Sequence, residues 1–124
     1  MNKNLTLAAV LGMVTVILGA FGAHRLKEIL SPESLESFET GVRYMMYHVL
    51  VVLILNSNNL IDTKQKNRLS ALFFMGILLF SGSIFVITLG LVPASSIWFI
   101  TPLGGVLLII GWALLAFSFF KKNS

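Results

Sequence analysis

Long apolar segments separated by short polar ones make up most of this chain. The clearest cover residues 5–23, 69–91 and 102–120, and a further segment over residues 37–58 carries polar side chains among the apolar ones. A bilayer core about 30 Å thick is crossed by about 20 helical residues. Each segment is long enough for one crossing. We therefore expect an all-α integral membrane protein with one domain, residues 1–124, folded as an antiparallel bundle of four transmembrane helices.

The second segment differs from the others because its helix is predicted to start well before the apolar part. Ser31 is suited to cap a helix, and Pro32 is suited to its first turn, where the missing N–H costs nothing. Glu33 then favours the positive end of the helix dipole. An apolar stripe continues from Leu35 to Val49. The pattern predicts one helix in which an amphipathic outer segment extends the second span.

The ends of the first and last segments are also marked. Residues 5–23 follow Lys3 and are compatible with a cleaved signal peptide, but they are longer than the apolar part of such peptides usually is. Residues 92–101 are predicted to form a turn, and Thr101 followed by Pro102 is typical of a helix start. Small residues also recur on one stripe of the first segment, which favours close packing against another helix. This stripe consists of Ala8, Gly12, Thr15, Gly19 and Ala23.

The composition supports a membrane location. Hydrophobic residues make up 56% of the chain and charged residues 11%, and the mean hydropathy is +0.90. A net charge of +4 in so apolar a chain is better explained by membrane topology than by nucleic-acid binding, so no nucleic-acid partner is expected. The chain has no cysteine, which excludes disulfides, a thiolate nucleophile and cysteine-based metal sites.

The distribution of basic residues predicts the orientation. Four crossings place both termini and the loop over residues 62–68 on one side of the membrane. Because Lys and Arg are enriched on the cytoplasmic side, both termini are expected in the cytoplasm. The basic residues on the side of the termini are Lys3, Lys64, Lys66, Arg68, Lys121 and Lys122, against Arg25, Lys27 and Arg43 on the other.

Four motifs carry a resemblance to a known family. They are GAFGAH over residues 19–24, RYMMYH over 43–48, LLFSGS over 78–83, and TPLGG over 101–105 followed by GW at 111–112. In these motifs and their order the chain resembles the YgdD/YwdK-like family of small bacterial membrane proteins, grouped as domain of unknown function 423. The resemblance covers nearly the whole chain. It implies four membrane helices, and no established activity, cofactor or catalytic residue.

The second segment carries a candidate polar cluster at membrane depth. Its densest part consists of Arg43, Tyr44, Tyr47 and His48. Ionisable groups in a membrane usually face the bundle interior or a water-filled cavity. Glu39 lies four residues before Arg43, so the two are expected to pair. His48 falls at mid-bilayer, where it needs one donor and one acceptor. Ser81 or Ser83 is expected to provide the hydrogen-bond partner of His48, directly or through a water. Thr15 and Trp112 are expected at the same depth, and His24 lies at the end of the first helix.

Three roles are open to this cluster. It can brace the bundle, it can bind or conduct a small ligand, an ion or a lipid headgroup, or it can catalyse a reaction. Catalysis is disfavoured because His48 with Ser81 or Ser83 has no acidic third member. A metal site is disfavoured because His24 and His48 have no diagnostic spacing. We therefore expect no enzyme activity, no cofactor and no metal.

The sequence thus predicts a non-enzymatic, multi-pass component of the bacterial plasma membrane that is structural or binds a ligand or lipid. The alternative is a small transporter or channel that uses Arg43 and His48. The expected partners are the lipid bilayer, a small ligand or lipid headgroup, and a second copy of the chain. Self-association is suggested by two heptad-spaced stripes of small residues. These stripes are Gly76, Ser83 and Gly90, and Gly104, Gly111 and Ser118.

Overall fold

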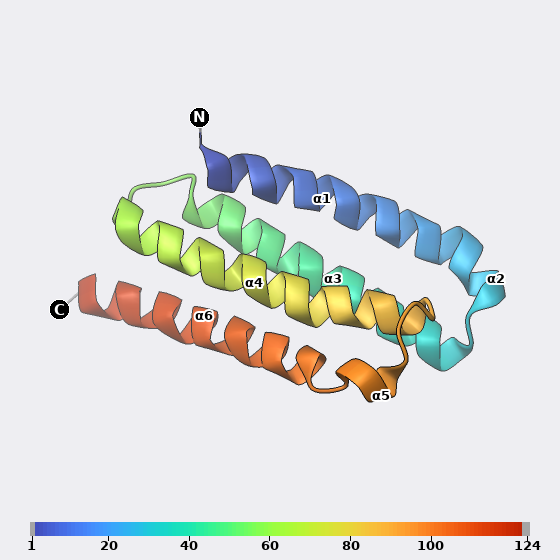
Figure 1. Ribbon diagram of the computed structural model, residues 1–124. Coiled ribbons are helices and arrows are strands. Elements are labelled where there is room, and N and C mark those ends of the chain that lie inside the picture. Colours follow the sequence, from blue (N-terminus) through green and yellow to red (C-terminus); the bar gives the residue numbers. More distant parts are fainter. Residues whose placement is uncertain (1, 123–124) are drawn as a thin grey trace.

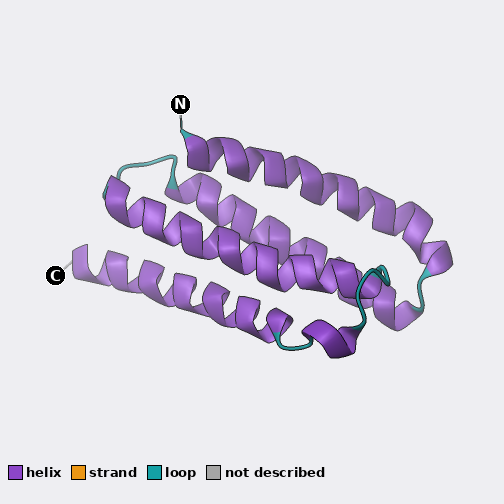
Figure 2. Cartoon of the chain, in the orientation of Figure 1, coloured by secondary structure: helices purple, strands orange, loops and turns teal. Residues whose placement is uncertain are grey.

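A computed structural model describes residues 2–122, and its regular structure in this range is entirely helical (Figure 2). Four helical runs, Lys3–Ile29, Pro32–Leu55, Thr63–Thr88 and Ile100–Lys121, are long and apolar enough to cross a membrane. This confirms the predicted all-α, four-span fold. The elements are α1 (Lys3–Phe21), the π-helix η1 (Gly22–Leu26), α2 (Lys27–Ile29), α3 (Pro32–Leu55), α4 (Thr63–Thr88), α5 (Ala94–Ile97) and α6 (Ile100–Lys122).

The long helices pack in chain order, α1 on α3, α3 on α4 and α4 on α6. Consecutive helices run in opposite directions (Figure 1). The start of α1 and the end of α6 therefore lie at one end of the bundle, beside the α3–α4 loop, and we call this the terminal end. The opposite end holds α2 and α5. Exposed apolar side chains cover the outer faces of α1 and α6, as a lipid environment requires: examples are Val16, Ile17, Ile109 and Phe117.

The predicted outer extension of the second span is present. The hydroxyl oxygen of Ser31 accepts a hydrogen bond from the backbone N–H of Ser34, and Pro32 occupies the first turn. From there α3 is continuous to Leu55, without a break at Gly41. The helix ends before the asparagine-rich loop, so its C-terminal end lies short of the predicted boundary at residue 58.

The last span begins slightly before its predicted start, and the predicted turn before it contains a short helix. The stretch over residues 92–101 contains the short helix α5 within the predicted turn, and α6 begins at Ile100. Thr101 therefore lies inside α6 and is not its cap. Its hydroxyl instead hydrogen-bonds the hydroxyl of Ser83 on α4. The side chain expected to cap the start of the last helix is thus used to join two helices.

Small residues bring α4 and α6 into close contact. A Cβ atom at Gly104 would collide with the backbone of Leu79 and Phe80, which shows that the two backbones touch there. A Cβ at Gly76 would fall 2.5 Å from a methyl carbon of Leu108, and one at Gly111 would lie 2.8 Å from the ring of Phe73. The two stripes therefore pack against each other within one chain. Gly90, the last member of the first stripe, lies outside α4 and has a φ of 75°. Because the stripes are used within one chain, they no longer support self-association, which stays a prediction.

The small residues of α1 face α3. A Cβ at Gly12 or Gly19 would lie 3.5 Å from a valine methyl of α3, and one at Gly22 would lie 3.0 Å from the ring of Phe38. Ala23, which was expected on this stripe, is exposed. The π-helix η1 begins at Gly22, and a π-turn holds one residue more than an α-turn. Gly22 and Leu26 are the residues buried in this turn.

Candidate functional site

Both nitrogens of the His48 imidazole are engaged in hydrogen bonds within the bundle. The indole N–H of Trp112 on α6 donates to Nε2 over 3.0 Å, and Nδ1 lies 2.6 Å from the backbone carbonyl oxygen of Tyr44. Because Nε2 accepts, Nδ1 carries the proton and donates it to that carbonyl. The side chain is 4% exposed. His48 is therefore a neutral ring with both nitrogens satisfied.

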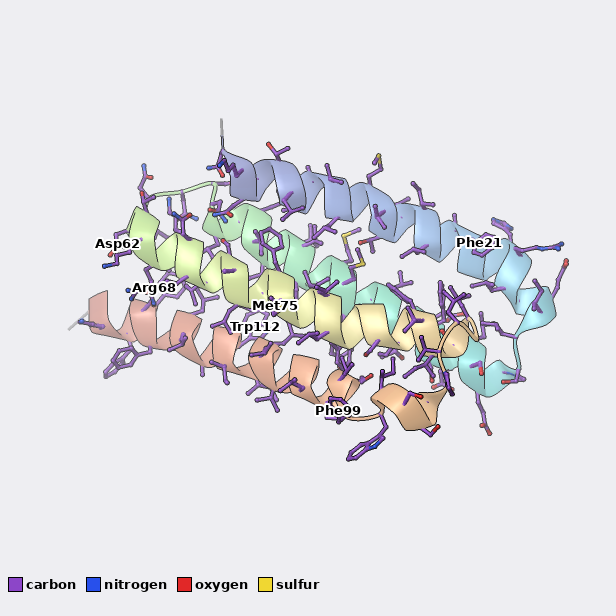
Figure 3. All side chains as sticks on the ribbon, viewed as in Figure 1. Phe21, Asp62, Arg68, Met75, Phe99 and Trp112 are labelled. Carbon is purple, nitrogen blue, oxygen red and sulfur yellow. The ribbon has the colours of Figure 1, made fainter. Side chains whose placement is uncertain are left out.

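Aromatic rings surround this hydrogen bond. The His48 ring centroid lies 5.8 Å from that of Phe73 on α4 and 6.0 Å from that of Trp112. Tyr44 lies 6.3 Å from His48 and 5.2 Å from Phe80. Figure 3 shows Trp112 about half-way along α6, level with Met75 of α4. The cluster thus links three helices near the middle of the spans.

The serines expected to bind His48 bind elsewhere. Ser81 is buried, and its hydroxyl donates to the backbone carbonyl of Gly41 over 2.7 Å. The Ser83 hydroxyl lies 3.0 Å from the carbonyl of Phe80 and also bonds the Thr101 hydroxyl. The expected pairing of His48 with Ser81 or Ser83 was therefore wrong. Thr15 likewise bonds within its own helix, since its hydroxyl donates to the carbonyl of Leu11 one turn earlier.

The charged members of the predicted cluster are not brought together. Arg43 is exposed, and its guanidinium donates to the hydroxyl of Thr40 over 3.0 Å. Within residues 2–122 no ion pair joins it to Glu39, which is also exposed, so that expectation was wrong. His24 is exposed in η1 near the opposite end and has no hydrogen bond to His48.

Tyr44 and Tyr47 lie on the outside of α3. Their side chains are 41% and 52% exposed, and their ring centroids are 5.6 Å apart. They flank the buried His48 without opening a path to it. In the described part of the chain, no group of three His, Cys, Asp or Glu is placed to hold a metal ion.

A large hollow lies instead at the terminal end, between α4, α6 and the α3–α4 loop. This basic groove has a volume of about 880 Å³ and is open on one side. Lys64, Arg68 and Lys121 line it, together with one acidic side chain, Asp62. Asp62 is already engaged, because its carboxylate caps α4 by accepting from the backbone N–H of Gln65 over 2.8 Å. Figure 3 shows Arg68 on α4, beside α6.

The basic groove changes character along its length. Its inner part is lined by apolar side chains of the spans, including Leu69, Leu114 and Phe117. The amide of Gln65 crosses it to the hydroxyl of Ser118 over 3.0 Å and so ties α4 to α6. The cations lie towards the ends of these helices. A molecule bound here would meet positive charge at one end and an apolar wall at the other.

A second hollow lies at the same end, between the N-termini of α1 and α4 and the C-terminal end of α3. We call it the asparagine hollow; its volume is about 640 Å³. It borders a hydrogen-bond network in which Asn4 donates to the side-chain oxygens of Asn56 (3.1 Å) and Asn67 (2.8 Å). Asn56 in turn donates to the hydroxyl of Ser70 over 2.8 Å. Its lining residues are Asn2, Lys3, Asn4, Asn56, Thr63, Lys66 and Asn67.

Sequence reasoning missed both hollows. It treated residues 62–68 only as a loop with basic side chains, whereas residues 63–68 form the first turns of α4. It used residues 56–58 only as the end of the second span. A usable signal was present, because Lys64 and Arg68 lie four residues apart and so share one face of α4. That this face opens towards the end of α6 follows only from the packing of the helices.

The sequence is similar to a protein family and to several bacterial membrane proteins. The family model described as "Protein of unknown function (DUF423)" matches residues 18–105. A UPF0382 membrane protein of Haemophilus influenzae is 42% identical over 99% of this chain and 98% of its own length. YwdK of Bacillus subtilis is 36% identical over 98% of each chain, and the inner membrane protein YgdD of Escherichia coli is 34% identical over 90% of this chain and 84% of its own. No solved structure shows a significant match.

Proposed function

This chain belongs to the DUF423 family of bacterial membrane proteins, and on that premise we propose that it is a non-enzymatic membrane component that binds an anionic phospholipid in the basic groove. In this proposal the protein resides in the plasma membrane and both termini lie in the cytoplasm. The groove then opens at the cytoplasmic surface, where anionic lipids attract basic side chains.

The observation that carries the proposal is the polarity of the basic groove. Lys64, Arg68 and Lys121 lie towards the terminal end of α4 and α6, and apolar side chains such as Leu114 and Phe117 lie nearer the middle of the same helices. A phospholipid in that leaflet has the same order of chemistry, with its phosphate at the surface and its acyl chains below. Basic pockets between helices on the cytoplasmic side are a recurrent form of lipid site.

The state of the polar cluster supports a bracing role for His48 over conduction or catalysis. A transport path would have to reach a ring that is 4% exposed and whose two nitrogens are both engaged. Arg43, the other residue of the alternative transporter hypothesis, lies on the exposed side of α3 and not beside His48. We therefore assign the cluster to stability and the basic groove to binding.

Lipid retention tests this function. The double variant Lys64→Gln/Arg68→Gln removes two cations from the groove and leaves its apolar wall intact. Each Lys or Arg near an anionic surface contributes about 1 kcal/mol, so the affinity for phosphatidylglycerol is expected to fall by roughly 30-fold. Native mass spectrometry of the protein in micelles that contain phosphatidylglycerol or phosphatidylcholine measures the bound lipid directly.

A matched control removes the same number of charges at the other end of the molecule. Arg25→Gln/Lys27→Gln changes two exposed cations that lie outside the groove. This variant should retain phosphatidylglycerol as the parent protein does. Equal retention of the two lipids by the parent protein would refute the proposal, as would an equal loss in both double variants.

A further inference from the structure

The asparagine hollow contains a buried cation without a counter-ion. Lys66 is only 9% exposed, and its ammonium has one hydrogen bond, to the side-chain oxygen of Asn59 at 3.4 Å. Asp62 lies one turn earlier on the same helix but uses its carboxylate to cap α4. Between residues 2 and 122 no carboxylate is paired with Lys66. Burying a charge in this way is costly unless an opposite charge accompanies it.

The other groups around the hollow are hydrogen-bond donors or amides. Lys3 adds a second ammonium, and the lining contains no acidic residue. The first backbone N–H groups of a helix have no partner within it. The hollow is lined by the first residues of α1, Lys3 and Asn4, and by the first residue of α4, Thr63. The dipole of α1 therefore adds positive potential to that of the two lysines, whereas the Asp62 carboxylate that caps α4 offsets the dipole of that helix.

We propose that the asparagine hollow binds a phosphate group, with Lys66 as its principal cation and Lys3 at the rim. This site goes beyond the proposed function because its lining comes from α1, α4 and the end of α3, without α6, and it shares no lining residue with the basic groove. Phosphate fits because its oxygens accept charge-assisted hydrogen bonds, which the ammonium groups of Lys66 and Lys3 can donate. The group can be carried by a lipid headgroup or be free inorganic phosphate.

Thermal unfolding of the full-length protein in detergent tests this site. The background variant is Lys64→Gln/Arg68→Gln, so that binding in the basic groove does not contribute. One arm compares sodium phosphate with sodium chloride at equal ionic strength. The other compares micelles that contain phosphatidic acid with micelles that contain phosphatidylcholine. A bound phosphate group stabilises the folded state and raises the unfolding midpoint, Tm.

The variant that decides the matter adds Lys66→Gln to this background. We expect Tm to rise with the phosphate-bearing ligand in the background protein and the rise to be lost with Lys66→Gln. Adding Lys27→Gln instead removes the same charge at the opposite end and should leave the rise intact. A rise in both arms assigns the site to the phosphate group itself, and a rise with phosphatidic acid alone assigns it to a lipid headgroup.

Two outcomes would overturn the inference. One is a background protein whose Tm is the same in phosphate as in chloride and the same in both lipids. The other is a ligand-induced rise that Lys66→Gln leaves unchanged. If Lys66→Gln does not yield folded protein, Lys3→Gln replaces it, because Lys3 is exposed at the rim and should weaken the rise without disturbing the core. Failure here leaves lipid retention in the basic groove unaffected, so the two proposals are separable.

Discussion

The indole of Trp112 donates a 3.0 Å hydrogen bond to the imidazole of His48. The bond joins α6 to α3, two helices that each pack against α4. Trp112 lies on α6 and His48 on α3, so the bond spans the middle of the bundle. It satisfies a tryptophan donor and a histidine acceptor at a depth where water is scarce. The bond therefore connects the last helix to the first half of the chain.

Removing this bond should lower the free energy of unfolding only slightly. The effects of removing the histidine and the tryptophan should not be additive, because both substitutions remove the same bond. Polar contacts between membrane helices average about 0.6 kcal/mol and reach about 1.7 kcal/mol. We expect a coupling free energy in that range from the cycle of His48→Ala, Trp112→Phe and the double variant, measured by unfolding in mixed micelles. Trp98→Phe is the control, because Trp98 is 68% exposed near the opposite end. A coupling of zero would mean that the bond does not hold the helices together.

The contact between α4 and α6 makes a stronger prediction. A Cβ at Gly104 meets the Leu79 carbonyl carbon at 2.7 Å, and backbone cannot move aside as a flexible side chain can. Gly104→Ala should therefore lower the free energy of unfolding by about 1–3 kcal/mol, the usual cost of overpacking. The neighbouring Gly105→Ala is the matched control, since its Cβ would lie 3.6 Å from the Phe80 ring. Equal effects of the two substitutions would contradict the backbone contact.

Helix existence and depth were predictable from the sequence, whereas rotation about the helix axes was not. Length and hydropathy define the spans, and the cap formed by Ser31 and Pro32 defines the start of α3. Counting along each helix also placed Trp112 at the depth of His48. Depth does not say which way a side chain points. Ser81 and Ser83 lie about 200° apart around α4, so they face different neighbours, and they bind Gly41 and Thr101 instead.

The site at the terminal end could not be predicted for a related reason. Lys64 and Lys121 are far apart in the chain, and only the antiparallel packing of α4 and α6 brings them to one groove. The Arg43–Glu39 pair was expected from their spacing of four residues alone. In the structure the guanidinium of Arg43 instead donates a hydrogen bond to the hydroxyl of Thr40. Spacing shows which groups share a face, and packing and local competition decide which of them bond.

The asparagine network predicts a sensitive position at the end of α3. Asn56 is 9% exposed and bonds Asn4, Ser70 and the carbonyl of Val52. Asn56→Ala would leave the fully buried hydroxyl of Ser70 without this partner, at a cost of about 1–3 kcal/mol. Asn58→Ala, in the loop, removes bonds to Ile54 and Leu60 only and should cost less. Chemical unfolding in mixed micelles compares them, and an equal or reversed order would contradict the bracing role of the network.

The orientation of the chain is the last prediction, and the location of the basic groove depends on it. Lys64 lies at the terminal end and Glu33 in the first turn of α3 at the opposite end, and both side chains are exposed. The chain has no cysteine, so Lys64→Cys and Glu33→Cys each introduce a single reactive thiol. If the positive-inside rule holds here, an impermeant thiol reagent added to intact cells labels the cysteine at position 33 and spares the one at position 64. Membrane disruption should then make position 64 reactive, which controls for accessibility.

Labelling of position 64 alone in intact cells would invert the topology and place the groove on the outer surface. Labelling of both would be incompatible with an odd number of crossings between the two positions, and with the fold itself.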